Sequence, residues 1–262
     1  MKPRFGISFY NRLKLELGEI DASAACLELA MREFIAASTL SANPTTFIQT
    51  LSSKHGIRVD VFDTAFFMRR GSALRIIGIT QAFEGFLDRM IENHPRIGNR
   101  DGRRGDETLL NFVVRKLDVP KHVAASFTYG LDYKLYSYYR LLRNGIAHPT
   151  HPTAASASLI ELQNATAADT RYVRLAAPNS AHGLNFDDYV LFSRASKSVA
   201  AQLCQISGLS EPEIMDWLEK QRDRSGSIER QVNNVRTNLR IAFGLDLQSA
   251  EPFVVNLGLS GQ

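Results

Sequence analysis

An arginine, an asparagine and a histidine stand within six positions of one another in the stretch YRLLRNGIAHP (139–149). Histidine exchanges protons near neutral pH, and the guanidinium of arginine is a permanently charged, planar donor that binds an anion in two places at once. Arg143, Asn144 and His148 are therefore candidates for acid–base and charge-stabilising chemistry. The alternative is an ordinary helix C-terminus, because an arginine there interacts favourably with the helix dipole.

The candidate residues close an amphipathic helix that we expect over roughly residues 131–143. Gly145 lowers helix propensity, and Pro149 disfavours a helical backbone at the residue before it. We therefore expect the chain to turn after Arg143 and to present His148 beside it. The buried face of this helix is predicted by apolar residues at i, i+4, i+7 and i+11: Leu131, Leu135, Tyr138 and Leu142.

The segments before this helix are also predicted to be helical. Residues 21–40 suit a helix with Asp21 as N-cap, and residues 43–56 a shorter one that ends at Gly56. The piece 57–71 receives no assignment. Two apolar faces are expected to be buried: Leu27, Ala30, Met31 and Phe34 in the first helix, and Ile76, Ile79, Phe83, Phe86, Leu87 and Met90 in a long helix over 72–93.

The second half continues the pattern after an Ala-, Thr- and Pro-rich stretch, residues 149–185, which we expect to be a long loop with a short strand at RYVRLA (171–176). A helix should follow Asn185 as its N-cap, and Ser210 and Glu213 have capping-box spacing for another. A last helix is expected over Ser227–Phe243. The chain is thus predicted to be all-α, with three parts: an N-terminal helical extension (1–70), a helical bundle (71–208) and a C-terminal helical extension (209–262).

Composition sets broad limits on the class of protein. The 262 residues are 44% hydrophobic and 22% charged, with a formal net charge of +4, which suits a globular chain and permits a polyanionic partner. Cys26 and Cys204 lie in apolar helical patterns and form no zinc-type cluster. Neither a signal peptide nor a membrane-length apolar run is visible, so we expect a cytoplasmic protein without a membrane partner.

The spacing Arg143-Asn144-x3-His148, at the end of an amphipathic helix in an all-α region, resembles the R-x4-6-H motif of HEPN-domain ribonucleases in its RN-x3-H form. The earlier segment GITQAFEGFLDRMIE (78–92) resembles a bundle helix of that family, and NFDDYVLFSRASKSVAAQLC (185–204) resembles the helix that closes the bundle. The resemblance covers about residues 70–208. The 35 residues between Pro149 and Asn185 form a longer segment than the compact connection expected there.

The resemblance implies an HEPN-like bundle that acts as an endoribonuclease without cofactor or metal. Such enzymes are typically homodimers in which two Arg/His motifs face each other and form one composite site. The ribose 2′-hydroxyl attacks the adjacent phosphate, with His148 as general base or acid, Arg143 as transition-state stabiliser and Asn144 in support. Glu84 occupies a position where the family often has a polar residue near the active site, although a solvated or helix-paired glutamate is the alternative.

Other residues are candidates for RNA binding. The loop RIGNRDGRRGDE (96–107) offers Arg96, Arg100, Arg103 and Arg104 for phosphate contacts, unless it is merely a solvated loop with interspersed acids. Tyr139 could stack on a base, whereas aromatic residues at helical spacing are more often core. His151 and His182 lie near His148 in sequence, but no matching cysteine or acid spacing supports a metal site.

The resulting hypothesis is a ribonuclease of the toxin–antitoxin or antiviral-defence type, with RNA as substrate and an antitoxin or regulatory protein as a further partner. The alternative is a non-catalytic HEPN-like dimerisation, regulatory or nucleic-acid-binding module, in which Arg143 and His148 only end a helix. Cleavage of RNA in EDTA that depends on His148 would separate the two.

Overall fold

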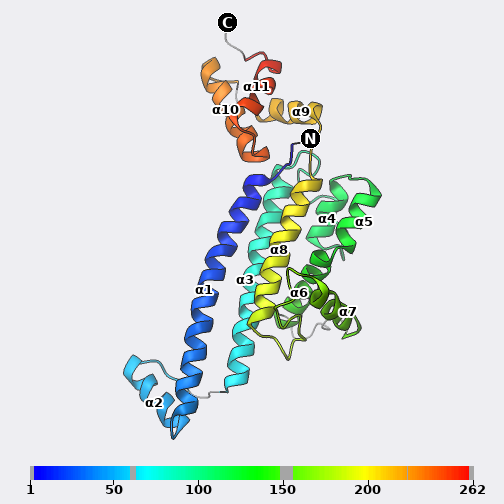
Figure 1. The fold of residues 1–262 in the computed structure, drawn as a ribbon. Coiled ribbons are helices and arrows are strands. Elements are labelled where there is room, and N and C mark those ends of the chain that lie inside the picture. The colour runs from blue at the N-terminus through cyan, green and yellow to red at the C-terminus, as the bar shows by residue number, and fades with distance from the viewer. Residues whose placement is uncertain (1–2, 60–62, 148–155, 223, 260–262) are drawn as a thin grey trace. The chain divides into compact units, whose positions relative to one another are not determined.

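A computed structural model describes residues 3–59, 63–147, 156–222 and 224–259 of the chain. Within these ranges every regular element is an α-helix, which confirms the expected all-α class (Figure 1). The helices are α1 (Ile7–Leu40), α2 (Pro44–His55), α3 (Thr64–Asn93), α4 (Leu109–Lys116), α5 (Lys121–Tyr129), α6 (Leu131–Ala147), α7 (Ser156–Ala168), α8 (Phe186–Ile206), α9 (Glu211–Gln221), α10 (Ile228–Phe243) and α11 (Leu247–Asn256).

The first and third helices begin earlier than the sequence pattern suggested. α1 starts at Ile7, so Asp21 lies inside the helix and is not its N-cap. α3 starts at Thr64, where the Asp63 carboxylate accepts a hydrogen bond from the Phe66 backbone N–H at 2.9 Å. The expected burial of Leu27 and Ala30 is also wrong, because Leu27 is 59% exposed and Ala30 is exposed as well, while Met31 and Phe34 are half-buried. Local capping signals alone did not reveal that both helices continue toward the N-terminus.

Several helix starts agree with the predicted caps. The Asn185 side-chain oxygen accepts hydrogen bonds from the backbone N–H groups of Asp187 and Asp188 at the start of α8. The Glu213 carboxylate accepts the Ser210 backbone N–H at 2.9 Å, as in a capping box before α9. These side chains satisfy backbone donors that have no partner within the helix.

The predicted long loop after the Arg/His motif is partly helical. α7 lies within it, and Leu162 and Thr166 of α7 are buried. The stretch RYVRLA forms turns and irregular backbone, not a strand, over residues 171–176. Three of its backbone N–H groups donate to carbonyls three or four residues earlier, for example Val173 N–H to Asp169 O at 2.9 Å. These are hydrogen bonds of turns, not of a β-sheet.

The chain divides into two compact units whose boundaries differ from the three predicted parts. Unit 1 comprises residues 1–16, 81–133 and 196–262, and unit 2 comprises residues 17–80 and 134–195. The helices α1, α3, α6 and α8 each contribute residues to both units. A division along the sequence cannot follow such units, because each unit is assembled from segments far apart in the chain.

An aromatic cluster around Phe5 organises unit 1. The Phe5 ring is fully buried, and its centroid lies 4.6 Å from that of His94, 6.2 Å from that of Trp217 and 5.3 Å from that of Phe243. The next residue, Gly6, has φ +86, and a Cβ there would overlap Met90 Sδ. This segment therefore joins α3, α9 and α10 into one core.

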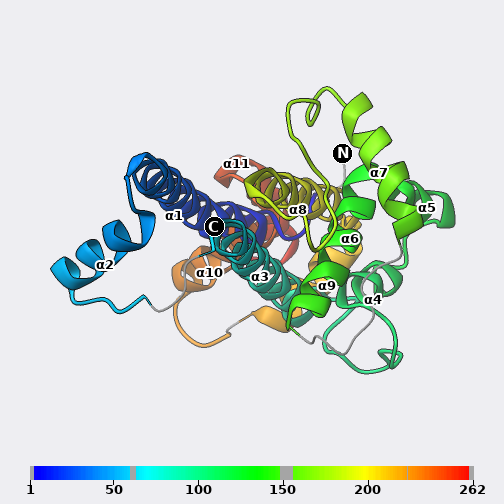
Figure 2. The ribbon, with the colours of Figure 1, turned by 90° about the horizontal axis from the view of Figure 1, so that it is seen from below.

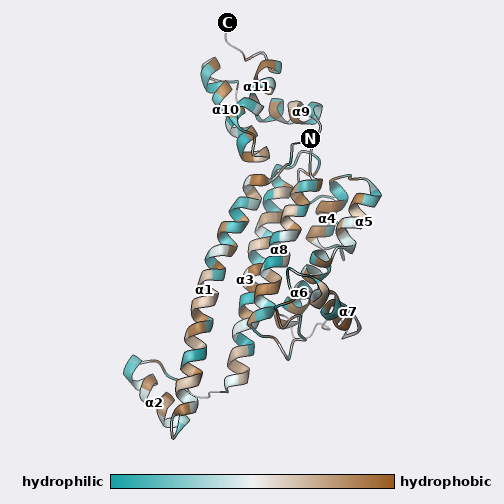
Figure 3. Ribbon diagram, viewed as in Figure 1, coloured by the Kyte–Doolittle hydropathy of each residue, from teal (hydrophilic) through white to brown (hydrophobic). Residues whose placement is uncertain are grey.

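The core of unit 2 combines apolar packing with buried polar contacts. In α3, Ile76 and Ile79 are fully buried, as the stripe predicted, and α6 adds Leu135 and Tyr139. On α1, Asp21 accepts hydrogen bonds from the hydroxyls of Tyr189 and Ser193 of α8 at 2.5 and 2.9 Å. The helices of this unit mix hydrophobic and hydrophilic residues along their length (Figure 3), as amphipathic helices with one buried face do.

Candidate active site

The helix that carries the motif is longer than predicted. α6 runs through Gly145 to Ala147, so the expected turn directly after Arg143 does not occur. A glycine costs about 1 kcal/mol in a helix relative to alanine, which the packing of the helix can offset. Leu142 is buried and Ile146 is half-buried, so the last turn still packs against the unit. Figure 2 shows α6 in the view from below.

Arg143 and Asn144 lie in the last turn and a half of α6. Both side chains are half-buried, and Arg143 Nη1 donates a hydrogen bond to Asn144 Oδ1 at 3.2 Å. Arg143 follows buried Leu142, on the flank of the apolar face, as the periodicity predicted. A guanidinium is permanently charged and planar, with several donors, which suits binding of an anion.

His148 is the residue that follows α6 in the sequence, and it lies outside the described residues, as does His151. The structure therefore does not test the pairing of Arg143 with His148. His182 is exposed, and no group of three or more His, Cys, Asp or Glu side chains in the described part of the chain is arranged to hold a metal ion.

Tyr139 has a structural role, and its predicted role in base stacking is wrong for this structure. Its ring is completely buried, and its hydroxyl donates a hydrogen bond to Asp188 Oδ1 at 2.8 Å. Burial, followed by the nearby Asp188 charge, raises the pKa of Tyr139 well above its usual value. A base cannot stack on a ring without access to solvent, so Tyr139 instead links α6 to α8.

Asp188 is the centre of this polar contact. Besides the Tyr139 hydroxyl, its carboxylate accepts the backbone N–H and the side-chain amide of Asn179 and the backbone N–H of Asn185, at 2.8 to 3.0 Å. Burial raises the pKa of Asp188, while these hydrogen bonds act in the opposite direction. Tyr138 is buried too and donates to the Asn179 carbonyl at 2.7 Å. The contacts fix the segment before α8 on α6.

Glu84 is half-buried on α3, next to the buried Phe83. It belongs to unit 1, whereas Arg143 belongs to unit 2. Its assignment to the active site therefore stays a prediction that rests on the family resemblance.

Arg96 is held by the protein itself, and its contact with RNA phosphate stays a prediction. Its guanidinium donates to both carboxylate oxygens of Glu213, at 2.8 and 2.9 Å, and to the Leu117 carbonyl at 2.6 Å. The hydrogen bonds from Arg96, and then those from Ser210, lower the pKa of Glu213 to about 2. Arg96 thus connects the end of α3 to α9.

The other three arginines of the loop are exposed. Arg100 forms an ion pair with Asp88, and Arg103 Nε donates to the Glu107 carbonyl at 3.0 Å. Arg104 donates its backbone N–H to the Glu107 carboxylate, whose main partner is Arg115. Such surface contacts are weak and exchange readily with solvent or a ligand. Phosphate binding by Arg100, Arg103 and Arg104 stays a prediction.

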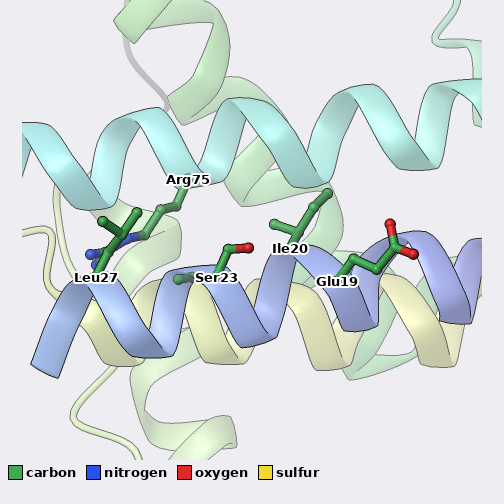
Figure 4. Close-up of a pocket in the computed structure, with 6 residues that line it drawn as sticks. Glu19, Ile20, Ser23, Leu27 and Arg75 are labelled. Atoms are coloured by element: carbon green, nitrogen blue, oxygen red, sulfur yellow. The ribbon is translucent and has the colours of Figure 1, made fainter.

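A shallow groove between α1 and α3 was not anticipated from the sequence. Within unit 2 it has a volume of about 290 Å³ and is lined by Glu19, Ile20, Ser23, Ala24, Leu27 and Arg75. In Figure 4, Arg75 extends from α3 toward Leu27 of α1. Arg75 donates to the Glu28 carboxylate at 2.7 Å, so its charge is already compensated. The exposed side of Leu27 is the wall of this groove.

The histidine that the structure buries most completely was also overlooked. His94 has no exposed surface, its Nε2 bonds to the Ser207 carbonyl at 3.2 Å, and its Nδ1 accepts the Arg96 backbone N–H at 3.2 Å. Burial lowers the pKa of His94 to about 4. Since both ring nitrogens bond to backbone, His94 is a neutral structural residue.

No helix of the described residues is long and apolar enough to cross a membrane. Comparisons of the chain with models of protein families, with curated proteins and with solved structures find no match.

Proposed function

We propose that this chain is a metal-independent endoribonuclease whose active site contains Arg143 and His148. The observation that carries the proposal is the half-buried pair of Arg143 and Asn144 near the end of α6, one helical turn before the sequence reaches His148. This is the residue pattern of the HEPN ribonucleases in an all-α chain. A permanent cation, an amide and a titratable imidazole are together sufficient for RNA cleavage by an internal nucleophile.

In the proposed reaction the ribose 2′-hydroxyl loses its proton to a base and its oxygen bonds to the neighbouring phosphorus. The bond from phosphorus to the 5′-oxygen of the next nucleotide then breaks, and that oxygen takes up a proton. The products are a 2′,3′-cyclic phosphate and a 5′-hydroxyl. His148 exchanges the protons, and Arg143 stabilises the additional negative charge on the phosphate oxygens. Asn144, hydrogen-bonded to Arg143, orients the guanidinium.

The site is proposed to be completed by a second copy of the chain, so that two Arg/His motifs contribute to one centre. Toxin or antiviral-defence action follows from the same resemblance, with an antitoxin or regulatory protein as the partner that restrains cleavage. Glu84 is proposed to support the site, and Arg100, Arg103 and Arg104 to contact phosphates away from the reacting bond.

The test compares purified wild type with His148→Ala on RNA in the presence of EDTA. The wild type should cleave RNA to products with cyclic phosphate and 5′-hydroxyl ends, and His148→Ala should not. His122→Ala is a matched control, because His122 is an exposed histidine of α5 in unit 1. The proposal is wrong if the wild type leaves RNA intact, or if His148→Ala cleaves as fast as wild type. RNA binding without cleavage would instead favour the non-catalytic module.

A further inference from the structure

A pocket is formed by α10 and the start of α11. Its volume is about 390 Å³, which is in the size range of pockets that bind small molecules. α10 ends at Gly244, whose left-handed backbone (φ +67) lets the chain leave the helix, and α11 begins at Leu247 (Figure 1). The lining residues all belong to unit 1, whereas Arg143 belongs to unit 2. They are Asn233, Arg236, Thr237, Arg240, Leu245, Asp246 and Leu247.

One face of α10 supplies hydrogen-bond donors to this pocket. The spacing i, i+3, i+4 and i+7 puts four side chains on one side of a helix. In α10 these are Asn233, Arg236, Thr237 and Arg240. Apolar side chains on the other side of α10 are buried: Val235, Leu239, Ala242 and Phe243. The amphipathic pattern of α10 therefore gives the pocket a wall of two guanidiniums, an amide and a hydroxyl.

Arg236 connects this wall to α11. Its Nη2 donates to Glu251 Oε2 at 2.7 Å, so its charge is already compensated. Its Nε is buried and has no hydrogen-bond partner in the described part of the chain. Arg236 is thus held in place by α11 and still has an unused donor.

Arg240 supplies an uncompensated positive charge. It is exposed, and its guanidinium forms neither an ion pair nor a hydrogen bond with another residue of the described ranges. Arginine binds a phosphate group through two parallel hydrogen bonds, which are strong because both partners are charged. Thr237, three positions earlier on the same face, adds a hydroxyl. This end of the wall therefore favours an anionic group.

The start of α11 contributes a carboxylate and apolar surface. Asp246 accepts the Ser249 backbone N–H at 2.8 Å as the N-cap of α11, and hydrogen bonds from Ser249 lower the pKa of Asp246. Leu245 is half-buried and Leu247 is exposed. A free inorganic anion would use only the donors of α10, whereas a larger anionic molecule would also cover the two leucines.

We propose that this pocket binds a small phosphorylated molecule. Arg240 and Thr237 donate hydrogen bonds to the phosphate oxygens, and the rest of the molecule packs on Leu245 and Leu247. Asn233 has both a donor and an acceptor on its amide and binds a polar group of that remainder. AMP is a suitable probe, because it joins a phosphate to a flat ring system with polar edges. This activity is separate from the proposed RNA cleavage.

The experiment is equilibrium dialysis of the full-length chain with radiolabelled AMP, with adenosine and inorganic phosphate as competitors. AMP should bind, and either competitor should bind more weakly because it fills only part of the pocket. Arg240→Ala should weaken AMP binding about tenfold or more, since it removes charged hydrogen bonds to phosphate. Arg230→Ala is the matched control, because Arg230 is an exposed arginine of α10 outside the pocket lining. It should bind AMP like wild type.

Asp246→Asn tests the charge of the ligand. Asparagine is as good an N-cap as aspartate, so the start of α11 is preserved while a negative charge is removed from the pocket. AMP binding should become stronger, since the phosphate is no longer repelled by the carboxylate. Weaker AMP binding by this variant would mean that the carboxylate attracts the ligand, contrary to the proposal.

A further variant separates this pocket from the proposed ribonuclease site, where Arg143 is a second candidate for contact with phosphate. AMP binding that Arg143→Ala abolishes and Arg240→Ala leaves intact would place the ligand in the ribonuclease site and refute the proposal. It is also refuted if the wild type does not bind AMP, or if Arg240→Ala binds AMP as well as Arg230→Ala. Circular dichroism should show the same helicity in all variants. Because dialysis measures binding, the result does not depend on RNA cleavage.

Discussion

Glu28 of α1 and Arg75 of α3 form a buried ion pair within unit 2. Arg75 Nη1 donates to Glu28 Oε2 at 2.7 Å, and the side chains are 9% and 5% exposed for Arg75 and Glu28. The Arg75 guanidinium also lies over the Phe186 ring of α8, 5.3 Å from its centre. A charge that is removed from water in this way depends on its partner, so the pair fixes the register of α1 on α3.

Glu28→Ala should lower the free energy of unfolding by about 3 kcal/mol, because it leaves the buried Arg75 charge without its carboxylate. Chemical denaturation measures the change. Arg32→Ala is the control, because Arg32 binds the same carboxylate at 3.0 Å but is 65% exposed, and it should cost less than about 1 kcal/mol. Equal losses in the two variants would contradict a special role for the buried pair.

Stability should decrease as the pH falls below about 6.5, because of His94. In the unfolded chain the His94 side chain has its ordinary pKa of about 6.5, whereas burial lowers the pKa of His94 to about 4 in the folded protein. Between these pH values the unfolded state binds more protons than the folded state. Lowering the pH therefore decreases the free energy of unfolding, by up to about 3 kcal/mol at pH 4.

Denaturation at several pH values between 6.5 and 5 tests this dependence on His94. The carboxyls of Glu107 and Glu213, whose pKa values Arg115 and Arg96 lower to about 2, affect stability only in more acidic solution. In His94→Gln the decrease should be much smaller than in wild type. If stability depended on pH as steeply in His94→Gln as in wild type, another group would be responsible.

Tyr139→Phe should lower the free energy of unfolding by about 2 kcal/mol, since it removes a hydrogen bond to the buried Asp188 carboxylate. The ring remains, so a base-stacking role would be preserved by this substitution. Thermal or chemical denaturation measures the loss, and the RNA-cleavage rate of the folded variant should match wild type. Normal stability would mean that the hydroxyl is not engaged with Asp188.

Replacement of Arg96 should lower stability and replacement of Arg104 should weaken RNA binding, although both residues belong to the same basic loop. Arg96→Ala removes the bonds to Glu213 and should cost about 1 kcal/mol of stability, with little effect on RNA binding. Arg104→Ala should leave stability unchanged and weaken RNA binding at low salt. Binding to RNA is measured with His148→Ala protein to prevent cleavage. If the folded Arg96→Ala variant bound RNA more weakly than the control, Arg96 would be shown to contact RNA.

Arg143→Ala should reduce the rate of RNA cleavage about a hundredfold, because a fixed positive charge at the attacked phosphate is lost. Arg143→Lys keeps the charge but not the planar donor, and should recover only part of the rate. Single-turnover cleavage assays measure both. Arg140→Ala is a control on the preceding turn of α6, and it should cleave like wild type.

The sequence by itself determined the helical class, the buried stripe of α3 and the N-caps of α8 and α9. These features depend on local periodicity and on side chains that bond to nearby backbone groups, which a sequence displays directly. It also singled out Arg143 and Asn144, which the structure finds half-buried on the flank of the apolar face of α6. Their catalytic partnership with His148 is still a prediction.

Only the tertiary structure decided which polar residues are buried and which apolar ones are not. Tyr139 and Arg96 looked available for RNA, yet Asp188 and Glu213, distant in sequence, engage them. Leu27 looked buried, yet it lines an open groove. The continuation of α6 past Gly145 likewise depends on packing, because propensity alone favours an earlier end. Such outcomes follow from contacts between residues far apart in the chain, which local sequence patterns do not contain.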